Sequence, residues 1–247
     1  MENGIGFFQP GWDENDSKNF IDYGLFFVPE RERQHEIICS AIPKTTVSTK
    51  IVDICCGDGL LDRVILRRFP HHQLYLFDGS MAMLEKAKEN LSEYIDRVVF
   101  TRFDLAKDDW RDFPWGVHAI VSSLAIHHLD DEGKKKLFRD LSSNLVSGGA
   151  LIIADMVKPA CEAGKEIAAR DWDDAVYKKS MELLGNPDAY EYFKKLNWNM
   201  YSDPNPDEED RPSTLFNQLK WLEEAGLVNI DVFWMKGGHA IFGGYKP

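Results

Sequence analysis

The sequence of 247 residues lacks the features that mark an exported or membrane-bound chain. Its start, MENGIGFFQP, has no basic segment followed by a long apolar core, as a signal peptide would have. No apolar run approaches the roughly 18 residues that suggest a membrane span. Internal repeats and low-complexity tracts are also missing. We therefore predict a cytoplasmic protein that does not bind a membrane.

Cysteine is scarce and poorly spaced for a shared site. The cysteines are Cys39, Cys55, Cys56 and Cys161, of which two are adjacent and two isolated, so they form no disulfide framework. Adjacent residues at the end of a strand point to opposite faces, which places Cys55 and Cys56 badly for chelating one metal ion. The CxxC spacing of redox and zinc sites is absent. The cysteines are therefore predicted to be small, buried, reduced thiols.

Positive charge is also in short supply. The chain has 41 Asp and Glu against 29 Lys and Arg, which gives a formal net charge of −12. No basic stripe offsets this surplus, and an acidic surface repels phosphate backbones. Tight binding of nucleic acid is thus not expected, whereas a small cationic cofactor would not be repelled. The hydrophobic fraction of 44% is ordinary for a soluble globular protein.

Short apolar runs alternate with amphipathic segments along most of the chain. Five alternations of strand and helix with short connections predict a parallel sheet covered on both faces. The run LVNIDVFWMKGGHAIFGGYK adds a terminal hairpin, which turns across residues 236–238. The expected strands are 50–56, 73–78, 97–104, 117–124 and 150–157; the expected helices are 32–43, 60–69, 80–94, 130–149 and 212–226. The glycines at 148 and 149 are expected to end the helix at 130–149.

The whole pattern predicts a single α/β domain over residues 1–247. Its sheet is expected to be doubly wound, mostly parallel and seven-stranded, with the C-terminal hairpin antiparallel. Residues 1–46 are a helical N-terminal cover, 47–157 the core, 158–212 a helical insert after the fifth strand, and 213–247 the last helix and hairpin. The acidic, proline-rich stretch DPNPDEEDRP in the insert is expected to be an exposed loop.

The loop after the first strand, DICCGDG, is the first place to look for a ligand site. In doubly wound sheets, ligands bind beyond the carboxyl ends of the strands, where strand order reverses. Gly57 and Gly59 let the backbone turn tightly and approach a ligand. The dinucleotide motif GxGxxG and the P-loop motif are absent. Asp78 and Asp104 end the second and third strands, where carboxylates can accept hydrogen bonds from a ribose and an adenine amino group.

The segments around these positions resemble those of a known protein family. The segments VDICCGDG, LFDGSMAML, FDL and VSSLAIHHLDDEGKKKLFRDLSSNLVSGGALIIADMV are similar to successive motifs of class I S-adenosylmethionine-dependent methyltransferases with a Rossmann-like fold. The family pattern is acid-x-Gly-x-Gly-x-Gly, and Cys55 stands in place of the first glycine. The chain most resembles uncharacterised bacterial members that act on small molecules, and more distantly the carboxy-S-adenosylmethionine synthase type. The resemblance implies methyl transfer to a small-molecule acceptor, with S-adenosylhomocysteine as the product.

The resemblance also implies which residues bind the cofactor. Residues of the first loop flank its methionine part, the acid after the second strand holds its ribose, and the pair after the third strand meets its adenine edge. Two residues after the fourth strand lie near the sulfonium, and two leader residues cover the site. In chain order these expected cofactor contacts are Tyr23, Arg31, Asp53, Cys55, Gly57, Asp78, Gly79, Ser80, Met81, Asp104, Leu105, Ser123 and Leu124.

The chemistry requires alignment and a dry pocket, and a general base only where the acceptor loses a proton. His127 and His128 follow the fourth strand, where an acceptor would meet the methyl group, and they are the candidate catalytic residues. Because they are adjacent, only one of them is expected to face the pocket. Ser122 and Ser123 stand where a magnesium site would need carboxylates, so no metal is expected. The candidate substrate contacts are Asp155, Arg170, Trp198, Tyr201 and His239.

Three other interpretations remain open. The chain could be a carboxy-S-adenosylmethionine-type enzyme, or a non-catalytic protein that binds the cofactor. A nucleotide-linked oxidoreductase is a further alternative, weakened by the missing GxGxxG motif. The sequence does not name the acceptor or the methylated atom, and a homodimer is compatible with it.

Overall fold

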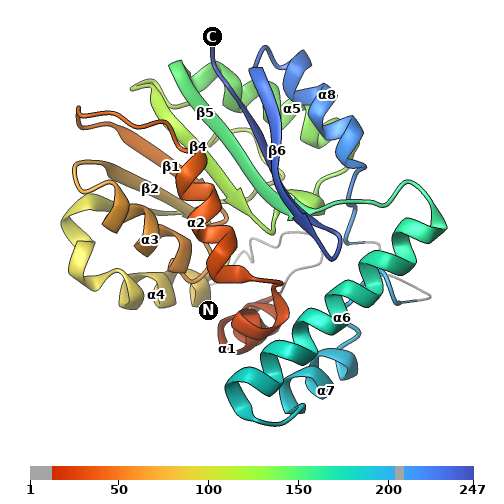
Figure 1. Cartoon of the computed structure of the whole chain (residues 1–247). Helices are drawn as coiled ribbons and strands as arrows, with labels where there is room; N and C mark the ends of the chain where they lie inside the picture. Colours follow the sequence, from red (N-terminus) through yellow and green to blue (C-terminus); the bar gives the residue numbers. More distant parts are fainter. Residues whose placement is uncertain (1–12, 204–208) are drawn as a thin grey trace, which may run out of the picture.

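A computed structural model of the protein describes residues 13–203 and 209–247. Seven strands form one sheet, as predicted, and their order is β3-β2-β1-β4-β5-β7-β6 (Figure 1). The first five run parallel, whereas β7 is antiparallel to both of its neighbours. The strands are β1 (Lys50–Ile54), β2 (Gln73–Asp78), β3 (Val98–Arg102), β4 (Val117–Ser123), β5 (Leu145–Met156), β6 (Val228–Lys236) and β7 (His239–Tyr245). Strand order reverses between β1 and β4, which is where such sheets bind ligands.

Helices cover both faces of the sheet, and a further group lies beyond its carboxyl edge (Figure 1). The α-helices are α1 (Glu14–Phe27), α2 (Arg31–Ala41), α3 (Leu60–Arg68), α4 (Met81–Asn90), α5 (Asp131–Asn144), α6 (Glu162–Leu184), α7 (Asp188–Lys195) and α8 (Leu215–Glu224). Two short 3-10 helices are η1 (Ser92–Arg97) and η2 (Ile126–His128). In the described part of the chain, no helix is both long enough and apolar enough to cross a membrane.

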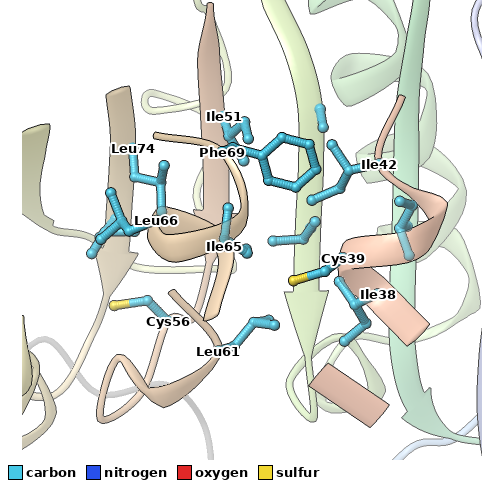
Figure 2. Packing of buried hydrophobic residues seen from close by; sticks show 14 of the residues in the cluster. Ile38, Cys39, Ile42, Ile51, Cys56, Leu61, Ile65, Leu66, Phe69 and Leu74 are labelled. Carbon is cyan, nitrogen blue, oxygen red and sulfur yellow. The ribbon is translucent and has the colours of Figure 1, made fainter. Parts of the chain in front are cut away.

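Two hydrophobic clusters hold the helices to the sheet. Figure 2 shows Ile38 and Cys39 of α2 meeting Ile65 of α3 in the cluster on one face. The cluster on the other face includes side chains of α5 and α8, such as Phe138 and Leu222, both fully buried. Burying such side chains stabilises the fold by roughly 1.5–3 kcal/mol each. The alternating apolar runs of the sequence thus end in two cores, one on each side of the sheet.

The cysteines are free, as predicted, but they are not all buried. Cys39 and Cys56 lie in the core, Cys55 is partly buried, and Cys161 is exposed just before α6. Cys161 is therefore a correction to the prediction. It is the residue before the first turn of α6, and among the described residues its side chain stays exposed at this helix start.

The boundary between α5 and β5 differs from the prediction. The helix ends at Asn144, and Leu145 already pairs with Val117 as the first residue of β5. The strand is irregular where Gly148 adopts a φ of 75°, so the two glycines bend a strand instead of ending a helix. A Cβ on Gly149 would lie 2.9 Å from the carbonyl oxygen of His118, which shows why the strands need glycine there.

The C-terminal hairpin turns through Gly237 and Gly238, as predicted, with φ of 55° and 76°. Positive φ at both central residues is typical of the tight turns that match the twist of paired strands. The Tyr201 hydroxyl lies 2.9 Å from the carbonyl oxygens of Val157 and Gly238. A Cβ on Gly238 would come within 2.1 Å of the Tyr201 ring. The insert is thereby fixed against the end of β5 and the hairpin turn.

The leader and the insert meet each other beyond the carboxyl ends of the strands (Figure 1). Phe27 of α1, Trp172 of α6 and Phe193 of α7 form a third cluster, and all three are buried. The indole Nε1–H of Trp172 donates to the carbonyl oxygen of Phe27 at 2.6 Å. Helices α1, α6 and α7 therefore make one layer, which we call the helical cover.

Candidate functional site

The loop after β1 makes a tight turn through three residues with positive φ. They are Cys55 (61°), Gly57 (56°) and Gly59 (74°). A Cβ on Gly59 would lie 3.1 Å from Ala87 Cβ of α4, so this glycine permits the close packing of α3 and α4. A Cβ on Gly57 would meet nothing nearer than the Met83 sulfur at 3.9 Å. Gly57 therefore leaves open backbone at the edge where a ligand is expected.

In this turn, Cys55 stands where the family pattern has its first glycine. A left-handed backbone costs a non-glycine residue roughly 1–2 kcal/mol. We predict that Cys55→Gly leaves the free energy of unfolding unchanged or raises it by up to about 1 kcal/mol, because glycine's larger unfolded-state entropy offsets part of the gain. The measurement is urea denaturation, with the neighbouring Cys56→Gly, which empties a core position, as the destabilised control. Equal destabilisation by both changes would contradict the prediction.

Asp78 ends β2 with its carboxylate aimed at the same loop. Its Oδ2 accepts the Gly57 amide at 2.8 Å, and its Oδ1 accepts the Ser80 amide at 2.9 Å. Burial raises the pKa of Asp78 to about 6, although the amides of Ser80 and Gly57 oppose this shift. Each carboxylate oxygen has two lone pairs, so the group can accept further hydrogen bonds while it holds the loop. The geometry fits the expected ribose-binding role.

The residues expected at the adenine side lie beside Asp78. Asp104 follows β3, and its Oδ1 accepts the Ala106 amide at 3.0 Å. Leu105 is buried, whereas Met81 at the start of α4 is 39% exposed. The Gly79 carbonyl oxygen accepts the Arg102 Nε–H at 3.2 Å. The carboxyl ends of β2 and β3 thus bring the predicted adenosine contacts to one edge of the sheet.

Glu14 reaches this edge from the leader, and sequence reasoning missed it. Its carboxylate accepts hydrogen bonds from the Ser80 hydroxyl (2.9 Å) and from the amides of Met81 (3.0 Å) and Ala82 (3.2 Å). Those amides form the first turn of α4, where a negative charge is favoured by the helix dipole. Glu14 therefore ties α1 to the expected cofactor site.

We predict that Glu14→Ala loosens α1. Losing hydrogen bonds with a net value of roughly 0.5–1.5 kcal/mol will raise amide hydrogen exchange in residues 14–27 about threefold to tenfold. Exchange in α5 should stay unchanged. The matched control is Asp22→Ala, at an exposed position of the same helix. If both variants alter α1 equally, the three contacts of Glu14 do not hold the helix.

Two other leader residues were expected to contact the cofactor. Arg31 makes a buried ion pair with Asp58 of the loop, with 3.0 Å between its Nη2 and Asp58 Oδ1. The Arg31 guanidinium also lies over the Phe20 ring, 4.8 Å from its centroid. Tyr23 packs in the helical cover, 4.6 Å from the Tyr192 ring. Arg31 thus positions the loop itself, and Asp58 is a partner that sequence reasoning missed.

A cavity of about 490 Å³ lies between the helical cover and the ends of β4 and β5. Its lining combines aromatic, acidic and histidine side chains and, among the described residues, holds no lysine or arginine. The lining residues are Asp16, Phe20, Phe27, Val28, Leu124, His127, His128, Met156, Trp172, Leu196, Asn197, Trp198, Met200, Asp203, Glu209, Asp210 and His239. The cavity is large enough for a small molecule and has an acidic wall.

Both histidines of the IHH segment line this cavity, so the prediction that only one would face it is wrong. They belong to the 3-10 helix η2, in which neighbouring side chains do not point to opposite sides as they do in a strand. The ring centroids of His127 and His128 are 4.2 Å apart. The tight turn after β4 therefore presents both rings on one wall.

His127 lies between two carboxylates. Its Nδ1 is 2.5 Å from Asp155 Oδ1, and its Nε2 is 3.4 Å from Asp210 Oδ1. The other Asp155 oxygen accepts the His127 amide at 2.8 Å. Burial lowers the pKa of His127, but Asp155 and Asp210 raise it further, to about 10. Burial and the adjacent His127 lower the pKa of His128 to about 4.

The predicted substrate contacts separate into two groups. Trp198 and His239 line the cavity, whereas Arg170 is exposed on α6 beside Asp171 and does not line it. Asp155 lies behind His127 with 2% exposure, and Tyr201 is buried against the hairpin turn. Ser123 ends β4, and Leu124 lines the cavity with a φ of 56°.

Asp210 is the cavity residue that sequence reasoning missed most clearly. The acidic stretch that contains it was expected to be an exposed loop; residues 204–208 lie outside the described part of the chain. Asp210 itself is only 28% exposed. The next residue, Arg211, donates its amide to the His127 carbonyl oxygen at 2.8 Å, and its own carbonyl oxygen accepts Lys134 Nζ–H. These contacts hold Asp210 against η2.

The comparisons with known proteins agree with this geometry. Residues 51–149 match the family model described as a methyltransferase domain. That segment contains β1 to β4, the glycine loop, Asp78 and the two histidines. Residues 51–149 are therefore similar to a methyltransferase domain, and the sheet order and strand-end residues are those expected for the class I, S-adenosylmethionine-dependent type.

Curated relatives match part of this chain. The ribosomal RNA small subunit methyltransferase C of Hamiltonella defensa is 26% identical over 55% of this chain and 40% of its own. The carboxy-S-adenosyl-L-methionine synthase of Shewanella halifaxensis is 29% identical over 44% of each chain. The trans-aconitate 2-methyltransferase of an Acidovorax species is 30% identical over 50% of this chain and 46% of its own. The chain thus spans less than half the length of these relatives.

The fold of this chain is also found in solved structures. An O-methyltransferase family protein from Burkholderia thailandensis aligns with a TM-score of 0.65 and 14% identity, over 98% of this chain and 64% of the other. At that identity the match supports the fold alone. It extends beyond residues 51–149 to the insert and the hairpin.

Proposed function

We propose that this methyltransferase transfers a methyl group from S-adenosylmethionine to a small-molecule acceptor held in the cavity under the helical cover. The observation that carries the proposal is the cavity itself. It lies at the ends of β4 and β5 and is roofed by α1 and α6, and its volume of about 490 Å³ suits a small molecule. A roofed, acidic cavity is a poor site for an RNA strand, which would favour an open, basic surface.

The described residues fit the cofactor at the neighbouring ends of β1 and β2. Gly57 offers open backbone, and Asp78 offers a buried carboxylate with spare lone pairs. S-adenosylmethionine would supply a methyl group that its sulfonium already activates, so the protein has to align the acceptor and exclude water. The helical cover suits the second task, because a dry site needs a roof that opens for exchange.

His127 and His128 are the proposed residues next to the reacting atoms. Both line the cavity and belong to the short helix η2, which follows Leu124 and Ala125 at the end of β4. Asp155 holds the ring of His127 and thereby acts as a positioning residue. Because the acidic lining repels anions, an acceptor with several free carboxylates is disfavoured. We therefore do not propose trans-aconitate, which the name of one relative contains, as the acceptor of this chain.

The test combines methyl-labelled S-adenosylmethionine with two acceptor pools from the same cells, a small-molecule fraction and total RNA. Label is expected in the small-molecule fraction. Labelling of RNA alone would overturn the proposal, and so would binding without transfer to either pool, which would indicate a non-catalytic binding protein. The mass of the ligand released from purified protein distinguishes the ordinary cofactor from its carboxylated form.

A variant links the activity to the cavity. Met200→Trp places an indole in the lining and should lower transfer at least tenfold, while binding of S-adenosylhomocysteine stays unchanged. Met181→Trp, at an exposed position of α6, is the matched control. Full activity of Met200→Trp would place the acceptor elsewhere.

A further inference from the structure

We infer that His127, His128 and Asp210 form a binding site for one divalent transition-metal ion on the wall of the cavity. Their potential ligand atoms all lie within 4.8 Å of one another. Two imidazoles and one carboxylate are a donor set that suits zinc, iron(II), manganese and cobalt. This site could not be expected from the sequence, because Asp210 is 82 residues away from His128 along the chain.

The distances favour an ion between these groups over direct hydrogen bonds. Asp210 Oδ1 is 3.4 Å from His127 Nε2 and 3.5 Å from His128 Nδ1. Good N–H···O hydrogen bonds are about 2.7–3.2 Å long, so both separations are too long. Around a tetrahedral ion with bonds of about 2.0–2.2 Å, neighbouring donor atoms lie about 3.4 Å apart. The two separations from Asp210 therefore match those around a tetrahedral ion, and a small rotation of the imidazole rings would bring the two nitrogens, which lie within 4.8 Å of each other, to the same spacing.

Asp155 provides the support that metal-binding histidines usually have. A ligand histidine typically donates its other ring N–H to a carboxylate, which fixes the ring and the tautomer. His127 Nδ1 lies 2.5 Å from Asp155 Oδ1, which leaves Nε2 directed at Asp210. Asp155 is itself fixed, since it accepts the amides of His127 and Met156 at 2.8 Å. The pair is 2–4% exposed and cannot reorient freely.

The charge around the three ligands also favours a cation. Asp16, Asp203 and Glu209 line the same cavity, and the described lining has no lysine or arginine. Three protein ligands leave at least one coordination position open toward the cavity. An oxygen atom of the acceptor, such as a hydroxyl or carboxylate, would suit that position. This last step rests on the proposed small-molecule function; the ion site does not.

The experiment uses the full chain after removal of metals with a chelator. Titration with Zn²⁺ against a chromophoric chelator is expected to show one ion per chain, and Co²⁺ should give the visible spectrum of a nitrogen- and oxygen-bound ion. His128→Ala and Asp210→Ala should each weaken Zn²⁺ binding more than tenfold. Asp155→Asn should weaken it about 10–100-fold, as loss of a supporting carboxylate does.

Two matched controls separate this site from general attraction. Asp203→Asn removes a charge from the same cavity but leaves the three ligands, and Cys161→Ser removes an exposed thiol. Both should bind Zn²⁺ like the wild type. Each variant must bind S-adenosylhomocysteine normally, which shows that it is folded. If a variant is unfolded, the wild-type melting temperature decides, because saturating Zn²⁺ must raise it.

Several outcomes would overturn the inference. They are an absence of stoichiometric Zn²⁺ binding, equal weakening by Asp203→Asn, or loss of binding only in Cys161→Ser. In those cases His127 is an imidazolium in a structural ion-pair network. Methyl transfer that persists in chelator would leave the proposed function intact and would exclude the ion from the transfer reaction. Zn²⁺ binding without any methyl transfer would support the ion site and overturn the proposed function. The two proposals can therefore fail separately.

Discussion

Asp78→Ala will weaken binding of S-adenosylmethionine at least tenfold. The variant removes the carboxylate at the end of β2 that the ribose hydroxyls are expected to meet. Charge-assisted hydrogen bonds contribute about 1.5–3 kcal/mol, which corresponds to roughly 10–150-fold in affinity. The change also frees the amides of Gly57 and Ser80, so the glycine loop loses its two anchors. Calorimetric titration at pH 7.5 measures the effect.

The pKa of Asp78 adds a pH signature to this prediction. Burial raises the pKa to about 6, and a protonated carboxyl cannot accept from both hydroxyls. Cofactor binding favours the ionised form, so affinity should fall as the pH drops through about 6, up to tenfold for each pH unit, and stay constant above 7. Asp78→Asn, which keeps the shape, should lose this pH dependence. Unchanged affinity in either folded variant would contradict the assignment.

The fold was predictable because its signals are local. The apolar runs, the glycines of the hairpin turn and the cap residues each specify their own neighbourhood. Ser80 illustrates this, because its side chain accepts the Met83 amide at the start of α4, as its place in the sequence predicts. The boundary of α5 was not predictable in the same way. Leu145 belongs to β5 because it pairs with Val117, a contact that periodicity cannot reveal.

The site was only half predictable, for the same reason. Asp78 and the glycine loop follow from strand ends in one sheet, which parallel topology brings together. Glu14, Asp58 and Asp210 contribute through side chains that meet residues 27 to 83 positions away. Acidic residues in loops and helix starts are usually solvated, so nothing in the sequence distinguishes these three from the other acids of an acidic chain.

Two buried acids behind the glycine loop lead to a prediction about how stability depends on pH. Asp53 of β1 and Asp62 of α3 are both buried, and Asp62 is not exposed at all. Asp53 Oδ1 and both Asp62 oxygens lack a hydrogen-bond donor from the described residues. Two ionised carboxylates in such a place would repel each other without compensation. Burial accordingly raises the pKa of Asp53 well above its usual value and that of Asp62 to about 8.

This pair should make the protein less stable as the pH rises. Below about pH 4 both the folded and unfolded states hold the proton of Asp62, so its contribution is complete. Between about pH 4 and 8 the unfolded chain releases a proton that the folded chain retains, which costs about 1.4 kcal/mol of unfolding free energy for each pH unit. Above about pH 8 the folded chain releases it as well, and the penalty levels off.

Asp62→Asn should remove most of this slope. The amide has the size of the carboxyl group and offers Asp53 a donor at every pH. Relative to the wild type, the variant should therefore gain about 3 kcal/mol of unfolding free energy when the pH is raised from 5 to 7.5. Urea denaturation at the two pH values measures the gain, and Asp96→Asn, at an exposed position, controls for the loss of one negative charge. If the two variants show the same pH dependence, Asp53 and Asp62 do not share a buried proton, and the glycine loop rests on an ionised pair stabilised in some other way.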